Sequence, residues 1–596
     1  MERESAVAAF CASHGGVHQR AASVSAASSA EIVDSPLADL LEELFAWGDI
    51  KATVVSRIAR AGVAEVQLRG SQASARLLKL ATGSKGHERK WLLRALAPSP
   101  EVPKPARIRV PCVPLRTNNA AVSFVSTKMF LINEVMEALF QGFPKRFADF
   151  LGGGLRNFWE RVDDIDPRLV GHPMLGRASW MDRAIPMVIH GDGVAFTMKG
   201  NSLACLSVGG VLCSGWSLHS WLMACFPKNC RAYESVYGAG NDTWHTIYKY
   251  VTHSFNALFT GIHPPLDPFG CAWPSGSKSE ELAGMPLCNG MFFGVVWHLS
   301  ADREWVSNEW KFPHWNAHKC CGHCPVDRTD TTCDLAALWK LRAYTPANDP
   351  GVLNHPIWSL PGVSRYTFHG DWAHTVEGGI MLYLHLHCLT TIKGFACVGL
   401  NATAACRHLW RILCAAYGEC GTTSRLQCLT PTMLDLSKTV MLKCKMNVSK
   451  NLVSPLLRVC RKYLDDSDAS LHLILCYECL EGVFAIIDKG GLFVSDDDAT
   501  ELLRLCELFL IHYMACSSAH EWLMPVTNKF HVLYHIAYFA RFQHPRAGWT
   551  YVWEDFVGRI QKIGMACTSG TPMHLVSDKI MDNYSVGVSH TLRVIG

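Results

Sequence analysis

The stretch IPMVIHGDGVAF (Ile185–Phe196) decides the fold, because it is a short apolar run that ends near an acidic residue between two glycines. Two more apolar runs follow, SLACLSVGGVL (Ser202–Leu212) and WSLHSWLMACF (Trp216–Phe226), and the turn-like segment Met198–Asn201 separates the first two. Short apolar runs with turn signals between them are typical of neighbouring β-strands. The three runs therefore predict an antiparallel meander, and a similar run at Ser364–His369 predicts a further strand.

Helical periodicity replaces this pattern on both sides of the meander. Leu502, Leu505, Cys506 and Phe509, for example, recur on one helical face. A chain of 596 residues is long enough for three or four domains. The predicted organisation is a disordered tail at 1–35, a basic helical region at 36–120, a helical connector at 121–183, an α/β core at 184–394, a helical block at 395–520 and a final core segment at 521–596.

Composition indicates a globular intracellular protein. Hydrophobic residues make up 49% of the chain and charged residues 18%, which favours large buried cores over disorder. Most of the 25 cysteines stand singly in apolar runs, as reduced core cysteines do, and the N-terminus lacks the apolar segment of a secretory signal. The apolar stretches Asn201–Pro227 and Ile380–Leu400 are too interrupted to cross a membrane, so we expect a soluble protein.

Positive charge is concentrated near the N-terminus. Residues 51–110 hold 13 lysines and arginines against three glutamates, although the whole chain has a net charge of only +4. The region is preceded by a predicted helix over Leu37–Trp47. It ends in a predicted Pro-rich linker over Pro98–Pro114. Its cations either form a solvated helical face or contact DNA phosphates, and no helix-turn-helix spacing is evident.

Three acidic residues occupy positions that suit metal binding. Asp192 lies near the end of the first predicted strand, and Asp371 follows the run at Ser364–His369. Glu554 lies on a predicted helix, away from its apolar stripe, and Gly558 follows one turn later. Taken singly, these residues are explained as a turn or cap residue, an N-cap and an exposed helical glutamate, respectively. Clustered together, three carboxylates would bind two Mg²⁺ ions, which can activate a water or a DNA 3′-hydroxyl and stabilise the departing oxygen.

The surroundings of these acids resemble the CACTA (En/Spm-type) DNA transposase family. The three matching blocks are His190-Gly191-Asp192-Gly193-Val194, Asp371-Trp372-Ala373-His374 with Gly378-Gly379, and the long block from Lys529-Phe530-His531-Val532-Leu533-Tyr534-His535 through Trp549-Thr550-Tyr551 to Glu554 and Gly558. The blocks lie between residues 185 and 565. Asp555 and Trp372 depart from the residues that are usual in the family at those positions.

The resemblance implies an α/β, RNase H-like mixed-sheet core that is interrupted by a large helical insertion, residues 395–520. It implies metal-dependent DNA strand cleavage and transfer by Asp192, Asp371 and Glu554, with His374 and Gly558 as neighbouring or phosphate-contacting residues. DNA as a partner, a homo-oligomer and a nuclear location follow from the same resemblance. Two alternatives remain open: a catalytically inactive, transposase-derived DNA-binding protein, and an unrelated zinc protein in which the acids are incidental.

A Cys/His-rich segment at 314–333 predicts a structural zinc site. Cys321 and Cys324 form a CxxC pair with a glycine in the turn. Zn²⁺ takes four sulfur or nitrogen ligands in closed structural sites. The residues nearby that could complete the four are His314, His318, Cys320, His323 and Cys333. The alternative is a reduced Cys-rich loop, because a single CxxC is weaker evidence than two.

Overall fold

The structure is a computed structural model that describes residues 35–114, 122–197, 200–213, 220–328, 355–437, 439–519 and 524–595. The predicted disordered tail therefore lies, except for Ser35, outside the described residues. The chain divides into two compact units. The first comprises residues 1–299, 354–367 and 552–596, and the second comprises residues 300–353 and 368–551. Both helices and small sheets are present, so the predicted α/β class is confirmed.

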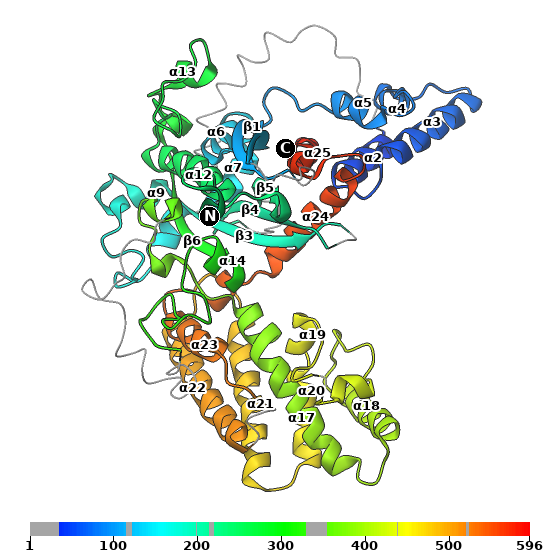
Figure 1. Ribbon diagram of the computed structural model, residues 1–596, viewed down its shortest axis with the longest axis vertical. Helices are drawn as coiled ribbons and strands as arrows, with labels where there is room; N and C mark the ends of the chain where they lie inside the picture. The colour runs from blue at the N-terminus through cyan, green and yellow to red at the C-terminus, as the bar shows by residue number, and fades with distance from the viewer. Residues whose placement is uncertain are drawn as a thin grey trace. The chain divides into compact units, whose positions relative to one another are not determined.

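The first unit contains a mixed four-stranded sheet with the strand order β5-β4-β3-β6 (Figure 1). Its strands are β3 (Ala184–Ala195), β4 (Ser202–Gly210), β5 (Trp221–Pro227) and β6 (Phe293–Ala301). The first three form the predicted antiparallel meander, in which Asp192 lies opposite Cys205. All residues of β5 and β6 are buried, which explains why these strands are continuous apolar runs rather than alternating ones.

One helix precedes β6 in the chain, and another packs on the sheet. Helix α12 (Thr243–Thr260) connects β5 to β6; Asp242 caps its start, and Gly261 ends it with a left-handed φ of 73°. Helix α24 (Tyr551–Cys567) packs on the sheet, because the Trp553 ring stacks on the His190 imidazole with 4.7 Å between centroids. His190 and Asp192 are two residues apart in one strand, so they share a face of the sheet. Helix α24 therefore covers the face that carries Asp192.

The N-terminal part of the first unit is helical, as predicted, and then forms a hairpin. Its helices are α2 (Pro36–Ala46), α3 (Ala52–Leu68), α4 (Ala75–Ala81) and α5 (Glu88–Ala95). The prediction of a linker at Pro98–Pro114 is wrong over β1 (Ala106–Cys112), which pairs with β2 (Ser123–Met129) in an antiparallel hairpin. In β1 the exposed Arg107 and Arg109 alternate with the buried Ile108 and Val110, the period of a strand with one buried face.

The predicted connector at 121–183 is helical only after β2. Helices α6 (Ile132–Gly142), α7 (Pro144–Leu151) and α8 (Leu155–Trp159) follow it. The strand predicted at Ser364–His369 is also wrong, because this segment contains a short 3-10 helix, η5 (Arg365–Thr367), in which Arg365 and Thr367 are buried. A run of six residues is too short for its composition to separate a strand from a buried turn.

The second unit is a helical body, and the helices predicted over 395–520 are confirmed there. They include the C-terminal end of α17 (Met381–Ala396), then α18 (Ala402–Glu419), α19 (Met446–Lys450), α20 (Val453–Tyr463), α21 (Asp468–Ile487) and α22 (Asp496–Ala519). One helix of the described residues, α21, is long and apolar enough to cross a membrane. Just over half of the most apolar stretch of that helix is buried, and its buried side chains belong to the hydrophobic core of the unit.

Candidate metal centre

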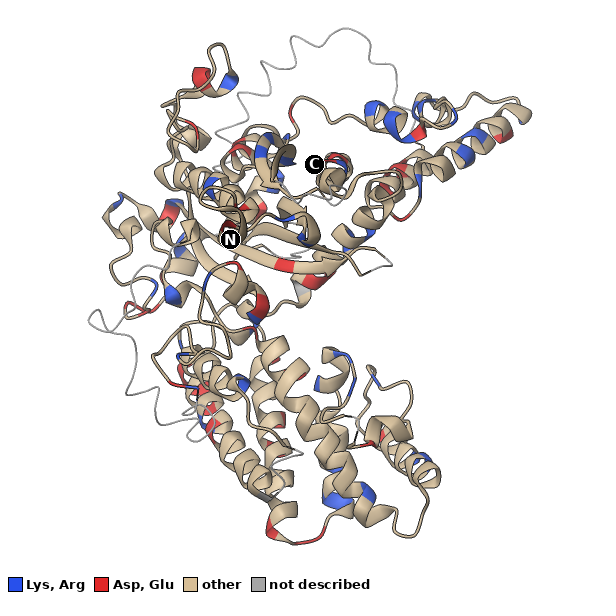
Figure 2. Cartoon of the chain, in the orientation of Figure 1, with Lys and Arg blue, Asp and Glu red and all other residues tan. Residues whose placement is uncertain are grey.

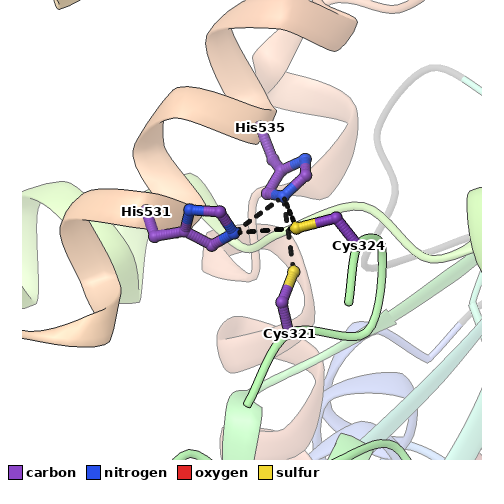
Figure 3. A group of neighbouring side chains, drawn as sticks. All are labelled: Cys321, Cys324, His531 and His535. Atoms are coloured by element: carbon purple, nitrogen blue, oxygen red, sulfur yellow. Dashed lines mark hydrogen bonds between the residues drawn. The ribbon is translucent and has the colours of Figure 1, made fainter. Parts of the chain in front are cut away.

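Four buried side chains of the second unit point toward one another: Cys321, Cys324, His531 and His535 (Figure 3). The two cysteines lie in the loop after α14 (Arg303–Asn308). The two histidines lie on α23 (Asn528–Phe539), four residues apart and therefore on one face of the helix. The cluster joins segments that are more than 200 residues apart in sequence.

The distances within the cluster fit a tetrahedral ion. His531 Nε2 lies 3.0 Å from His535 Nε2 and 3.3 Å from Cys324 Sγ, and Cys321 Sγ lies 3.3 Å from His535 Nε2. All four ligand atoms lie within 4.8 Å of one another. Zn–S and Zn–N bonds of about 2.3 and 2.0–2.1 Å place tetrahedral ligands about 3.3–3.8 Å apart. A Cys₂His₂ donor set with this spacing matches a structural zinc site.

The protonation of the cluster also suits a cation. Burial raises the pKa of the Cys321 thiol, but hydrogen bonding to Cys324 and to the neighbouring histidines holds that pKa well below its ordinary value. The hydrogen bond with Cys321, and then burial, raise the pKa of Cys324. Burial lowers the pKa of His535 to about 4, so its imidazole is neutral near pH 7. Thiolate and neutral imidazole are the forms that bind Zn²⁺, and a bound cation would favour the thiolate in both cysteines.

Backbone contacts hold the cysteine loop in place. The His323 N–H donates to Cys321 Sγ at 3.3 Å, and the half-buried Arg303 guanidinium donates to the carbonyl of Cys320 and, at 3.1 Å, to that of Pro313. A Cβ on Gly322 would lie 2.0 Å from the ring of Phe312, so the turn between the two cysteines has room only for glycine. This is the glycine that the sequence places inside the CxxC pair.

The sequence therefore identified two members of the cluster, and the other two come from an unexpected place. Cys320, His318 and His323 were predicted as ligands but are not in the four-residue group. The side chain of His318 is 81% exposed and pairs with Asp327, and Cys320 Sγ accepts a hydrogen bond from Asn528. The ring nitrogen Nε2 of His323 contacts the Phe368 carbonyl at 2.9 Å. His314 contacts Asn316, and Cys333 lies outside the described residues.

Asp192 and Glu554 both belong to the first unit. Asp192 is half-buried on β3, and its Oδ1 accepts the N–H of Gly193 at 2.6 Å. Glu554 is half-buried on α24, next to the fully buried Trp553. The apolar stripe predicted on this helix is confirmed for Trp553, Phe556, Ile560 and Ile563, all of which are buried. A Cβ on Gly558 would meet no atom within 4 Å, so there is open space beside the backbone one turn after Glu554.

Asp371 belongs to the second unit and has several hydrogen-bond donors. It is 5% exposed and precedes η6 (Ala373–Ile380), a π-helix. Its Oδ1 accepts the Ala373 N–H at 2.9 Å, and its Oδ2 accepts the Thr550 hydroxyl at 3.0 Å and contacts His374 Nδ1. The His374 side chain is 44% exposed, so the imidazole is held by a buried carboxylate on one side and reaches solvent on the other.

A fourth acidic residue, Asp302, was not identified from the sequence. It directly follows β6, the strand beside β3, and its Oδ1 accepts the Trp305 N–H at 2.7 Å at the start of α14. The signal that could have identified Asp302 is the apolar run at 293–301, which an aspartate directly follows. This run has the same character as the run that ends near Asp192.

In comparisons with known proteins, no protein-family model and no curated protein matches the chain.

Proposed function

We propose that this chain is a transposase-like protein that catalyses metal-dependent DNA strand cleavage and transfer. The observation that carries the proposal is the arrangement of Asp192 and Glu554. Asp192 lies on an inner strand of the mixed sheet, and the helix that carries Glu554 packs on the same face of that sheet through Trp553 and His190. An inner-strand acid and a late-helix acid on one face are what the resemblance to the CACTA family implies.

The topology supports an RNase H-like core. Such a core begins with three antiparallel strands and, after a helix, places its fourth strand beside the first. Here β3, β4 and β5 form the meander, α12 follows, and β6 neighbours β3. In this proposal the helices between η6 and α23 are an insertion between the sheet and the final acidic helix.

Asp192 and Glu554 would hold the catalytic Mg²⁺ ions. Both offer carboxylate oxygens, which Mg²⁺ prefers, and the half-buried position of each leaves room for water and phosphate oxygens as further ligands. When bound, such ions activate a nucleophilic water or 3′-hydroxyl and stabilise the departing oxygen. The exposed imidazole of His374 is one proposed contact for DNA phosphates. The backbone at Gly558, which has open space beside it, is another.

The third acidic ligand has two candidates. Asp371 is the residue that the sequence predicts, but both of its oxygens already accept hydrogen bonds. Asp302 directly follows β6, the strand next to β3 in the sheet. The sheet topology favours Asp302 as the metal ligand.

Two asparagine variants decide this point and test the proposed function. The parent protein is expected to nick or join labelled transposon-end DNA in Mg²⁺. Asp302→Asn should abolish cleavage at every Mg²⁺ concentration, although asparagine still caps α14. Asp371→Asn should lower cleavage only at limiting Mg²⁺. If Asp371→Asn abolishes cleavage throughout and Asp302→Asn does not, Asp371 is the ligand. If the parent protein binds DNA without cleaving it, the chain is instead a catalytically inactive, transposase-derived DNA-binding protein.

The N-terminal helices supply the proposed sequence-independent DNA contacts. Lysine and arginine residues occur along α3, α4 and α5 (Figure 2). Some of these cations have structural partners: Arg76 pairs with Asp39 and Glu42, and Arg69 pairs with Glu65. Lys85 and Lys90 are exposed. Exposed cations of this kind release counterions when they neutralise DNA phosphates.

Replacing Lys85 and Lys90 with glutamine is expected to weaken DNA binding and its salt dependence. Each phosphate contact contributes about 0.9 to the slope of log K against log salt, so the slope should fall by about 1.8. Fluorescence anisotropy of labelled DNA at several salt concentrations measures this slope. The matched control is Lys443→Gln with Lys445→Gln, two exposed lysines of the second unit. Equal slopes for the parent and the Lys85/Lys90 variant would refute the N-terminal contact.

A further inference from the structure

The chain enters α24 through Thr550 and Tyr551, and a buried carboxylate holds each of them. The Thr550 hydroxyl donates to Asp371 Oδ2 at 3.0 Å, and the Tyr551 hydroxyl donates to Glu377 Oε2. Asp371 is 5% exposed and Glu377 is fully buried. Burial raises the pKa of Glu377 to about 7, although the Tyr551 hydroxyl lowers it. Hydrogen bonds in such surroundings are shielded from water and hold their partners firmly.

Packing restrains the same entry segment. A Cβ on Gly548 would lie 2.8 Å from the Gly370 carbonyl oxygen, so the backbone just before α24 lies directly against the backbone just before Asp371. The Arg546 guanidinium lies over the Trp549 ring, 4.7 Å from its centroid. Lys529 Nζ donates to the His374 carbonyl at 2.8 Å and so ties α23 to η6. Residues 548–551 are thus held against residues 370–377 by main-chain contact and by two hydroxyl hydrogen bonds.

We propose that Asp371 and Glu377 are positioning residues for Glu554, acting through Thr550 and Tyr551. Tyr551 and Glu554 are three residues apart and are therefore neighbours on the helix surface. A shift of the first turn of α24 moves Glu554 with it, and a metal-binding carboxylate must be held within about 0.5 Å of its working position. The inference rests on the proposed function, because it assigns Glu554 a metal. It also gives Asp371 a role that does not require metal coordination.

Tyr551→Phe and Thr550→Val remove one hydroxyl each and keep the shape of the side chain. Loss of a residue that orients a metal ligand typically costs about 10-fold to 100-fold in metal affinity. Each variant should therefore raise the Mg²⁺ concentration for half-maximal cleavage about 10-fold and approach the parent rate at saturating Mg²⁺. Glu554→Gln should not recover at any concentration. Without metal, amide hydrogen exchange at residues 551–556 should be about 5-fold to 10-fold faster, the effect of one lost hydrogen bond.

The matched control is Tyr534→Phe, which breaks another tyrosine–glutamate bond of the second unit, Tyr534 to Glu507 at 2.8 Å. It should leave both the Mg²⁺ requirement and the exchange of α24 unchanged. The positioning role is overturned if Tyr551→Phe matches the parent in both measurements, or if Tyr534→Phe shifts both equally. A parent without Mg²⁺-dependent cleavage overturns the proposed function and this inference with it. A cleaving parent with unaffected variants overturns the inference alone.

Discussion

The purified protein is expected to contain one zinc ion, and Cys321→Ser is expected to remove it and to destabilise the second unit. The four ligands connect the loop after α14 to α23 in the interior of this unit. Without the ion, four buried cysteine and histidine ligand atoms remain within 4.8 Å of one another. Loss of a structural metal is among the few changes that cost more than about 4–5 kcal/mol. For a unit of this size that corresponds to a fall in melting temperature of about 10–20 °C.

Metal analysis and calorimetry of the same preparations measure both effects. His318→Gln is the matched control, because His318 lies in the same Cys/His-rich segment but its side chain is 81% exposed. That variant should keep one equivalent of zinc and the parent melting temperature. His535→Ala should behave like Cys321→Ser. Less than about half an equivalent of zinc in the parent, or an unchanged zinc content in Cys321→Ser, would contradict a closed four-ligand site.

Glu554→Gln is expected to abolish strand cleavage while leaving DNA binding intact. The exchange removes a ligand charge with little change of shape. Metal ions contribute several kcal/mol of transition-state stabilisation, so the rate should fall on the order of 10³-fold or more. Denaturing gels of labelled DNA measure the cleavage, and anisotropy measures the binding.

The neighbouring residue provides the control for this prediction. Asp555 is 61% exposed and pairs with Arg559 on the same helix. Asp555→Asn changes the charge of α24 by the same amount, one residue away, and should retain the parent rate. Equal losses in both variants would show that the total charge of the helix matters rather than a metal ligand at Glu554.

The sequence was most informative where a local pattern sets the structure. The runs from Ile185 to Phe226 became strands because each is apolar over a strand's length and is followed by turn residues. The hairpin of β1 and β2 was missed, although Arg107-Ile108-Arg109-Val110 alternates plainly. The prolines around that segment favoured a linker instead. The run that becomes β6 was missed as well, and with it the position of Asp302.

The metal centre shows that a high local density of cysteine and histidine in the sequence does not identify all of the metal ligands. The CxxC pair was identified, and its partners were sought within a few residues, among Cys320, His318 and His323. The actual partners, His531 and His535, lie on a helix more than 200 residues later. Their i, i+4 spacing in the Lys529–His535 block is the signal that could have found them, because it places two imidazoles on one helical face. Only the folded chain brings that face to the cysteine loop.

In the proposed reaction Asp192 binds the metal that activates the attacking group, and Asp192→Cys tests this role most directly. Mg²⁺ is a hard ion that requires oxygen ligands, whereas Mn²⁺ accepts softer ones more readily. The measurement is strand cleavage by the parent and by the cysteine variant in Mg²⁺ and in Mn²⁺. Metal ligation by Asp192 predicts that the variant is inactive in Mg²⁺ and regains cleavage in Mn²⁺. Cleavage by Asp192→Cys at the parent rate in Mg²⁺ would contradict it.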